Sequence, residues 1–298
     1  MKILPLMLLI CGGTILHLNP LLIRTANPTP QSTTNLLGRH YQVGEKLSYH
    51  MKGINQNWQY EIQADGIVKK DAAGAFFEEY AWSNMISAGQ PFALPATSAD
   101  FRQTLSLGPE HPPAIPDFSK VHPMLIGPMA DLLTFYSDLW LVNRAANFSH
   151  EGDHFYVKNG APSSWADGSR VLVGEDSIDF DITLKSISQS DQTAVVLVRH
   201  VPPAQPQVKI PAEWMRAPVA DTPNNWVQVQ KNADGKFVGE VGKETFDVEI
   251  KVSLTNGKML SAKMDNPVEV LKRECTDAAL TVCGPAARYK ILRQIEIH

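Results

Sequence analysis

The chain has 298 residues, a formal net charge of -4 and a sequence pI near 6.1. Hydrophobic residues make up 44% and charged residues 19% of it, which is a globular composition with enough apolar side chains for a sizeable core. A nucleic-acid-binding surface would be basic and clustered, and the sequence has no basic run, so we expect no nucleic-acid partner.

The N-terminus has the profile of a secretory signal. Met1-Lys2 gives a short positive start, and Ile3–Ile23 is mostly apolar. We predict a signal peptide over residues 1–26, with an uncleaved anchor as the alternative, followed by a flexible Pro/Thr/Ser-rich linker over residues 27–39. The remaining residues, 40–298, are interpreted as a single β-rich domain without a further span long enough to cross a bilayer. The expected location is periplasmic or extracellular.

Strand alternation begins after the linker. Apolar and polar residues alternate over Lys46–Met51 and Trp58–Ala64, which is typical of antiparallel strands with one wet face. Asp65-Gly66 can be interpreted as a turn or as a bulge. Further strands are predicted at Ala75–Ile86, Phe101–Leu107, Ser177–Leu184, Thr193–Val201, Trp226–Lys231, Lys236–Val241, Thr245–Leu254, Lys258–Met264, Val268–Glu274 and Tyr289–Ile297.

One long helical segment interrupts the strands, over Ser119–Asn147. Gly127-Pro128 predicts a break between a leading turn and a main helix at Met129–Asn147. The main helix has a wide apolar side, and its polar side includes Asp131 and Asp138. Four apolar residues of this helix are the predicted ligand-binding residues, and they are Leu132, Phe135, Tyr136 and Trp140.

The helix leads into His150-Glu151-Gly152-Asp153-His154, which has the letters of the zinc-hydrolase motif H-E-x-x-H. Such a site would use His150, His154 and Glu175 as zinc ligands and Glu151 as the general base, and it needs both histidines on one helical face. Gly152-Asp153 favours a turn, and the aromatic and β-branched residues that follow favour a strand. We therefore predict no cofactor and keep zinc as the alternative.

Two smaller patterns complete the candidates. Asp179 and Asp181 lie on one strand face beside Asp176, where they could share a cation, although a solvated sheet face is the preferred interpretation. Cys275 and Cys283 are the two cysteines outside the leader, and in an exported chain they predict one local disulfide, with two free thiols as the alternative.

Taken together, the elements predict a mainly β protein: a large curled antiparallel sheet, either a half-barrel or an open barrel, wrapped around one long central helix.

The segment Tyr41–Tyr49 (YQVGEKLSY) resembles the V-G-E-x-L-x-Y opening of a family of secreted bacterial proteins of unknown function. These proteins resemble, more distantly, the half-barrel lipoprotein carriers of the LolA and LppX type. The resemblance implies a curved sheet around an apolar cavity, and it assigns no functional residue.

Three functions follow as hypotheses. The first is an exported, non-enzymatic envelope protein that binds an apolar small molecule such as a lipid or acyl chain. The second is a secreted zinc-dependent hydrolase, and the third is a structural or interaction module with an envelope partner protein.

Overall fold

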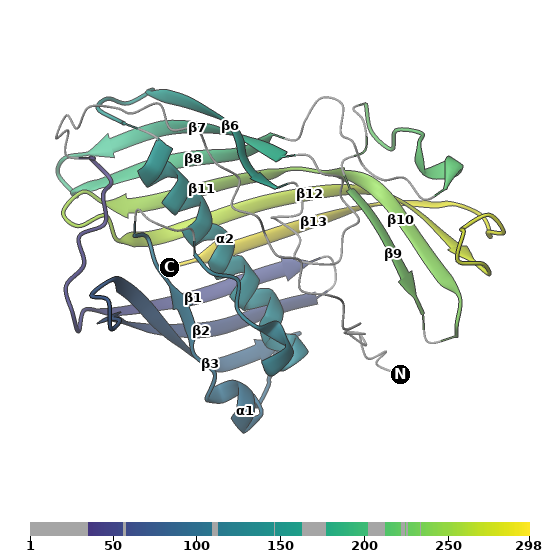
Figure 1. Ribbon diagram of the computed structural model, residues 1–298, viewed down its shortest axis with the longest axis horizontal. Coiled ribbons are helices and arrows are strands. Elements are labelled where there is room, and N and C mark those ends of the chain that lie inside the picture. The colour runs from purple at the N-terminus through teal and green to yellow at the C-terminus, as the bar shows by residue number, and fades with distance from the viewer. Residues whose placement is uncertain are drawn as a thin grey trace.

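The computed structural model describes residues 35–298 except 56–57, 109–112, 146, 163–176, 202–211, 222–223, 225 and 233. The predicted signal peptide, residues 27–34 of the predicted linker and Glu175 lie outside the described residues. The described part is mainly β, as predicted (Figure 1). Its elements are β1 (Lys46–Asn55), β2 (Trp58–Lys70), β3 (Phe76–Ser87), β4 (Gln90–Pro91), α1 (Ala96–Ala99), β5 (Gln103–Leu105), α2 (Pro123–Ala145), β6 (His154–Pro162), β7 (Ser177–Ser188), β8 (Thr193–Val201), β9 (Trp226–Lys231), β10 (Phe237–Glu244), β11 (Phe246–Ser253), β12 (Met259–Cys275) and β13 (Ala287–Ile297), with 3-10 turns at Phe118–Lys120 and Glu213–Met215.

The strands form one large open sheet in the order β4-β3-β2-β1-β13-β12-β11-β8-β7-β6, and all the pairings are antiparallel. Several neighbours, such as β1 and β2, β2 and β3, and β7 and β8, follow one another in the chain through short turns. β11 and β8 pair although β9 and β10 lie between them in the sequence. β13 lies between β1 and β12 and so joins the first strands of the sheet to the later ones. The main hydrophobic core lies on one face of this sheet, where the inward residues of the strands meet α2.

Several strands are longer than the sequence predicted. β2 continues through Asp65-Gly66, so this pair is neither a turn nor the site of the bulge, which lies between Glu61 and Gln63. Likewise, the two strands predicted on either side of Pro267 are one strand, β12. Pro267 lacks an amide donor and lies opposite Thr245, between the registers of β10 and β11, where its carbonyl accepts a bond from the Thr245 amide at 3.3 Å.

The sheet carries an extension, which we call the arm. β10 and β11 follow β12 in one continuous register, from Phe237↔Cys275 to Asp247↔Asp265. On their other side, β11 pairs with β8 whereas β10 pairs with β9, so the sheet divides at Thr245. The arm comprises β9, β10 and the halves of β12 and β13 paired there, and in Figure 1 it projects to the right of the main sheet. It has a second hydrophobic core of its own, whose buried members are Ala212, Met215, Val227, Val241, Leu271, Cys275 and Leu280.

Residues 35–41 form a strap that packs on the main body, and residues 35–39 of this strap belong to the stretch predicted as a flexible linker. Leu37 is fully buried in the main core. The Asn35 side-chain amide donates to the Asn143 carbonyl at 2.7 Å, and the His40 amide donates to the Asn256 carbonyl at 2.8 Å. Leu36 and Leu37 pack against the main core, and their burial stabilises the strap although most of the surrounding residues are polar.

The long helix is continuous through Pro128, contrary to the predicted break. Proline removes one amide donor from the helix. However, Leu125 and Met129 are both fully buried, and their packing holds the helix together on either side of Pro128. None of the helices in the described part of the chain is long and apolar enough to cross a membrane.

Candidate functional site

The candidate site is the contact between α2 and the sheet, because α2 crosses the sheet face and bonds to strands far apart in the sequence (Figure 1). Two rows of side chains with a spacing of seven residues characterise this helix. Asp131 and Asp138 form one row and face the sheet, with 1% and 0% exposure. The other row, which we call the outer row, consists of Ile126, Leu133 and Trp140, all partly exposed.

The two rows lie on opposite sides of the helix. At ~100° per residue, Leu133 lies about 200° around the axis from Asp131. A helix on a protein surface normally directs apolar residues to the core and charges to water. In α2 the carboxylates point inward, and the outer row lies on the opposite side of the helix, where it is partly exposed and also packs against the main core. The polar side to which the sequence assigns Asp131 and Asp138 therefore faces the sheet at these two residues.

The first buried contact joins Asp131 to two strands. The Tyr60 hydroxyl, from β2, donates to the Asp131 carboxylate at 2.6 Å, and Arg293, from β13, forms an ion pair with the same carboxylate. Burial lowers the pKa of Arg293 and raises that of Tyr60. The carboxylate and the guanidinium compensate each other's charge inside the core.

The second contact joins Tyr136 to β3 and to the strap. The hydroxyls of Tyr136 and Tyr80 both donate to one oxygen of Glu78, and they also lie within hydrogen-bond distance of each other. The other Glu78 oxygen accepts from Arg39 at 3.1 and 3.2 Å, and Arg39 also pairs with Glu45 at 2.8 Å. Burial is the largest cause that raises the pKa of both tyrosines, so they remain neutral donors to the carboxylate.

The third contact is a buried pair of Asp138 and His200. The Nε2 atom of His200, on β8, lies 2.9 and 3.0 Å from the two carboxylate oxygens. The rings of Phe180 and Phe246 flank the imidazole, with centroids 4.8 and 5.0 Å away. We call these three sets of bonds the docking contacts, because each ties α2 to a different part of the sheet.

Two glycines make room for the tyrosines of the docking contacts. Gly53 pairs with Tyr60 across β1 and β2, and Gly66 pairs with Tyr80 across β2 and β3. A Cβ atom at Gly53 would lie 2.1 Å from the Tyr60 ring, and one at Gly66 would lie 2.5 Å from the Tyr80 ring. Each ring therefore lies across the glycine backbone of the neighbouring strand, an arrangement in which an aromatic residue covers a strand glycine.

The four predicted ligand-binding residues do not share one surface. Leu132 and Phe135 are fully buried between α2 and the sheet, and Tyr136 is occupied in the second docking contact. Trp140 is the one that reaches the surface, where its indole nitrogen donates to the Gly108 carbonyl at 2.8 Å.

The H-E-G-D-H segment has no helical geometry. Glu151 and Gly152 form a turn in which Gly152 has φ +85°, and His154 begins β6. The Glu151 carboxylate accepts from the Ile187 amide at 2.6 Å, and that of Asp153 accepts from the amides of Ser149 and His150. These backbone bonds, from Ser149 first, lower the pKa of Asp153. The turn that Gly-Asp favours is present, and the helical pair that the alternative zinc site requires is not.

The other acidic residues on the strand face have partners of their own. His154 Nε2 lies 2.5 Å from Asp181, and the Tyr156 hydroxyl donates to Asp179 at 2.9 Å. Asp176 lies outside the described residues. Within the described ranges, no group of three His, Cys, Asp or Glu residues is arranged to hold a metal ion.

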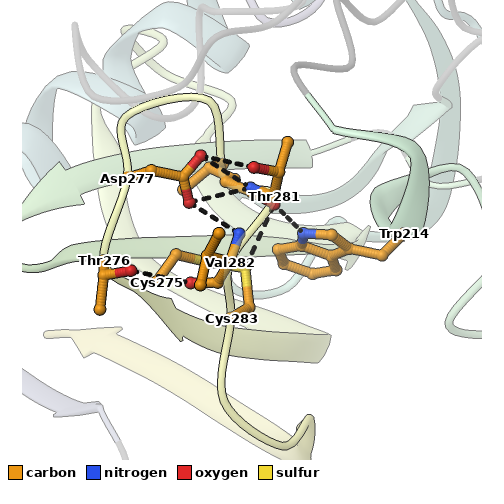
Figure 2. The surroundings of a disulfide bond; sticks show 8 residues. Trp214, Cys275, Thr276, Asp277, Thr281, Val282 and Cys283 are labelled. Atoms are coloured by element: carbon orange, nitrogen blue, oxygen red, sulfur yellow. Dashed lines mark hydrogen bonds between the residues drawn. A yellow bond between two sulfur atoms is a disulfide. The ribbon is translucent and has the colours of Figure 1, made fainter.

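The predicted disulfide is present at the end of the arm. Cys275 and Cys283 are bonded, with their Cα atoms 4.0 Å apart (Figure 2). Figure 2 also shows Trp214 beside this loop, where its indole nitrogen donates to the Leu280 carbonyl at 3.1 Å.

No protein-family model matches the sequence, and neither a curated protein nor a solved structure matches the chain.

Sequence reasoning missed most of the docking contacts. The helical pattern assigns Asp131 and Asp138 to the polar side of the helix, and alternation assigns Glu78 to the strand Ala75–Ile86, but neither pattern indicates a buried partner. One available signal was His200 at the end of the valine-rich segment Thr193–Val201, since a polar ring among buried strand residues requires a partner.

Proposed function

We propose that this protein is an exported, non-enzymatic envelope protein that binds an apolar ligand such as a lipid or an acyl chain. The observation that carries the proposal is the outer row of α2. Ile126, Leu133 and Trp140 place apolar surface on the side of the helix that faces away from its buried carboxylates. A row of partly exposed apolar side chains is a candidate interaction site, whereas a single exposed leucine needs no such explanation.

The docking contacts support the same proposal. The bonds of Asp131 and Asp138 to Arg293, Tyr60 and His200 hold the helix at one rotation about its axis, with the outer row on the side away from these carboxylates. Reversing the helix would leave the two carboxylates without their partners, at several kcal/mol each, and would also turn Leu132 and Phe135 away from the sheet. The buried polar bonds therefore keep the apolar row available at the surface.

In this proposal, the sheet curls as a half-barrel around α2, and the ligand lies along the outer row with Trp140 at one end. Trp140 is suited to this position because its indole N–H is already bonded to Gly108, which leaves the ring as apolar contact surface. Leu132, Phe135 and Tyr136 form the support behind the row rather than its lining.

The test is a fluorescence titration of the purified chain with 11-(dansylamino)undecanoic acid. We expect saturable binding, and Leu133→Ser is expected to weaken it by about fivefold to tenfold, since a partly buried leucine contributes roughly 1 kcal/mol of apolar contact. The matched control is Leu292→Ser, because Leu292 is an exposed leucine, at 47%, on β13 away from α2. It should bind the probe as the unchanged chain does.

Absence of saturable binding by the unchanged chain would overturn the proposal, as would equal losses in the two variants. Thermal melting of both variants checks that each is folded. Protein partners recovered with the chain in the absence of any bound lipid would favour the interaction-module hypothesis instead.

A further inference from the structure

The second core in the arm is separate from the main core. The two clusters share no residue, and the second contains residues from the turn at Glu213–Met215, from β9, β10 and β12, and from the disulfide loop. The loop contributes Leu280, which is fully buried. Because the second core is small, the removal of one large side chain leaves much of its apolar surface uncovered.

Leu280 is held in place against its own backbone preference. Its φ is +56°, in the left-handed region that bulky residues rarely adopt. Two sets of contacts keep it there. Asp277 accepts from the amides of Thr281 and Val282 at 3.1 and 2.7 Å, and Trp214 donates to the Leu280 carbonyl (Figure 2).

The other side of the second core leaves little room for adjustment. Gly239, on β10, faces the loop, and a Cβ atom there would lie 2.7 Å from Met215 and 3.1 Å from the Leu280 side chain. Leu280 therefore fits directly onto the backbone of β10, next to Met215 and Trp214. The disulfide closes the loop that contains Leu280, since Cys275 is the last residue of β12 and Cys283 follows Leu280 by three residues.

We infer that the Cys275–Cys283 disulfide is a redox-sensitive closure of the second core, which opens on reduction while the main core stays folded. Cys275 is 1% exposed, whereas Cys283 is only partly buried, so a reductant reaches Cys283 first. A thiolate of a dithiol reductant attacks the Cys283 sulfur, and the Cys275 thiolate leaves and takes up a proton. The second thiol of the reductant then displaces Cys283, which is also protonated, and the reductant becomes a disulfide.

Reduction breaks the one covalent bond that closes the loop. Leu280 can then relax from its positive φ and leave the core, and Trp214 and Met215 lose the side chain that covers them. The main core contains none of these residues, and α2 bonds to none of them through the docking contacts. This inference concerns the arm alone and does not depend on ligand binding by the outer row.

The test is hydrogen–deuterium exchange of the full chain, followed by mass spectrometry, with and without dithiothreitol. We expect peptides covering residues 212–219, 237–244 and 276–283 to exchange at least tenfold faster after reduction, while peptides covering α2 are unchanged. The variant Cys275→Ser/Cys283→Ser should show the same pattern without reductant. A matched variant, Leu280→Ala, should speed exchange in the same peptides with the disulfide intact, because it removes the side chain that the loop places in the second core.

Unchanged exchange in the arm after reduction would overturn the inference, because the loop would then hold Leu280 without the bond. A parallel loss of protection in α2 would overturn it too, since the two cores would then open as one.

Discussion

Two glycines, Gly53 and Gly66, leave the space that the rings of the buried tyrosines Tyr60 and Tyr80 occupy. At Gly66 the Tyr80 ring occupies the space in which a Cβ atom would stand, and the Tyr80 hydroxyl continues to Glu78 and Tyr136. The absence of a side chain at Gly66 therefore lets the Tyr80 ring take the position from which its hydroxyl bonds Glu78 and contacts Tyr136 on α2. Its own backbone needs no unusual conformation, since Gly66 is not among the residues with positive φ.

We therefore expect Gly66→Ala to destabilise the protein by about 1–3 kcal/mol, the usual cost of forcing an extra group into a filled core. Chemical denaturation, followed by circular dichroism, measures the free energy of unfolding. The matched control is Gly127→Ala in α2, where the nearest atom to a new Cβ is 3.8 Å away on Trp58. This control should be neutral or stabilising by up to about 1 kcal/mol, because alanine is the better helix former. Destabilisation by Gly127→Ala and not by Gly66→Ala would contradict the argument.

The helix α2 is the element whose orientation the protein specifies most strongly. Its apolar residues alone would allow several rotations about the axis, because they cover most of its circumference. Three buried polar groups remove that freedom, since each has its partner at one rotation only. Buried polar groups of this kind favour one arrangement over its alternatives, although they add little net stability.

The pair of Asp138 and His200 allows this idea to be measured. Asp138→Ala should destabilise the protein by about 3–5 kcal/mol, because it leaves His200 buried without its partner. The double variant Asp138→Leu/His200→Leu should recover most of that loss, since an apolar pair requires no compensation. The exposed pair of Lys185 and Glu249 is the control, and removal of either residue should cost less than about 1 kcal/mol. If the double variant is as unstable as the single one, the polar bond contributes stability in its own right.

The local patterns of the sequence predicted individual elements well and their assembly poorly. Alternation in Lys46–Met51 and Ser177–Leu184 indicated strands because the pleat imposes that period, and Gly152-Asp153 indicated a turn because of its backbone preferences. The inward direction of Asp131 could not be predicted in this way, because its partners Tyr60 and Arg293 are far away in sequence. Helical periodicity alone predicts that a charged residue faces the solvent, and only knowledge of a partner on another element would change that prediction.

At the scale of the whole molecule, buried tyrosines make the protein sensitive to alkali. Burial is the largest cause that raises the pKa of six tyrosines above the usual value, namely Tyr41, Tyr49, Tyr60, Tyr80, Tyr136 and Tyr289. Above about pH 10, the unfolded chain loses tyrosine protons that the native chain retains. The unfolded state then binds fewer protons, so the free energy of unfolding falls as the pH rises.

We expect the stability to be unaffected by these groups below about pH 9, and to decline above pH 10 by up to about 1.4 kcal/mol per pH unit for each buried tyrosine. Absorbance of tyrosinate at 295 nm, recorded together with circular dichroism, measures this. The main rise in absorbance should coincide with unfolding, apart from a contribution by the exposed Tyr156. Ionisation of all seven tyrosines in a protein with native circular dichroism would show that the buried hydroxyls are accessible.

The position of β13 has a consequence for the order in which the molecule can form during synthesis. β13 follows the other strands in the chain, and it supplies the pairing edge for both β1 and β12. Until residues 287–297 have left the ribosome, the first and the later strands can form only separate sheets with unpaired edges, and Arg293 cannot reach Asp131. Long-range pairing of this kind folds slowly. A nascent chain should therefore stay open to chaperones until β13 has been synthesised, and its closing step is the insertion of this strand between two preformed halves.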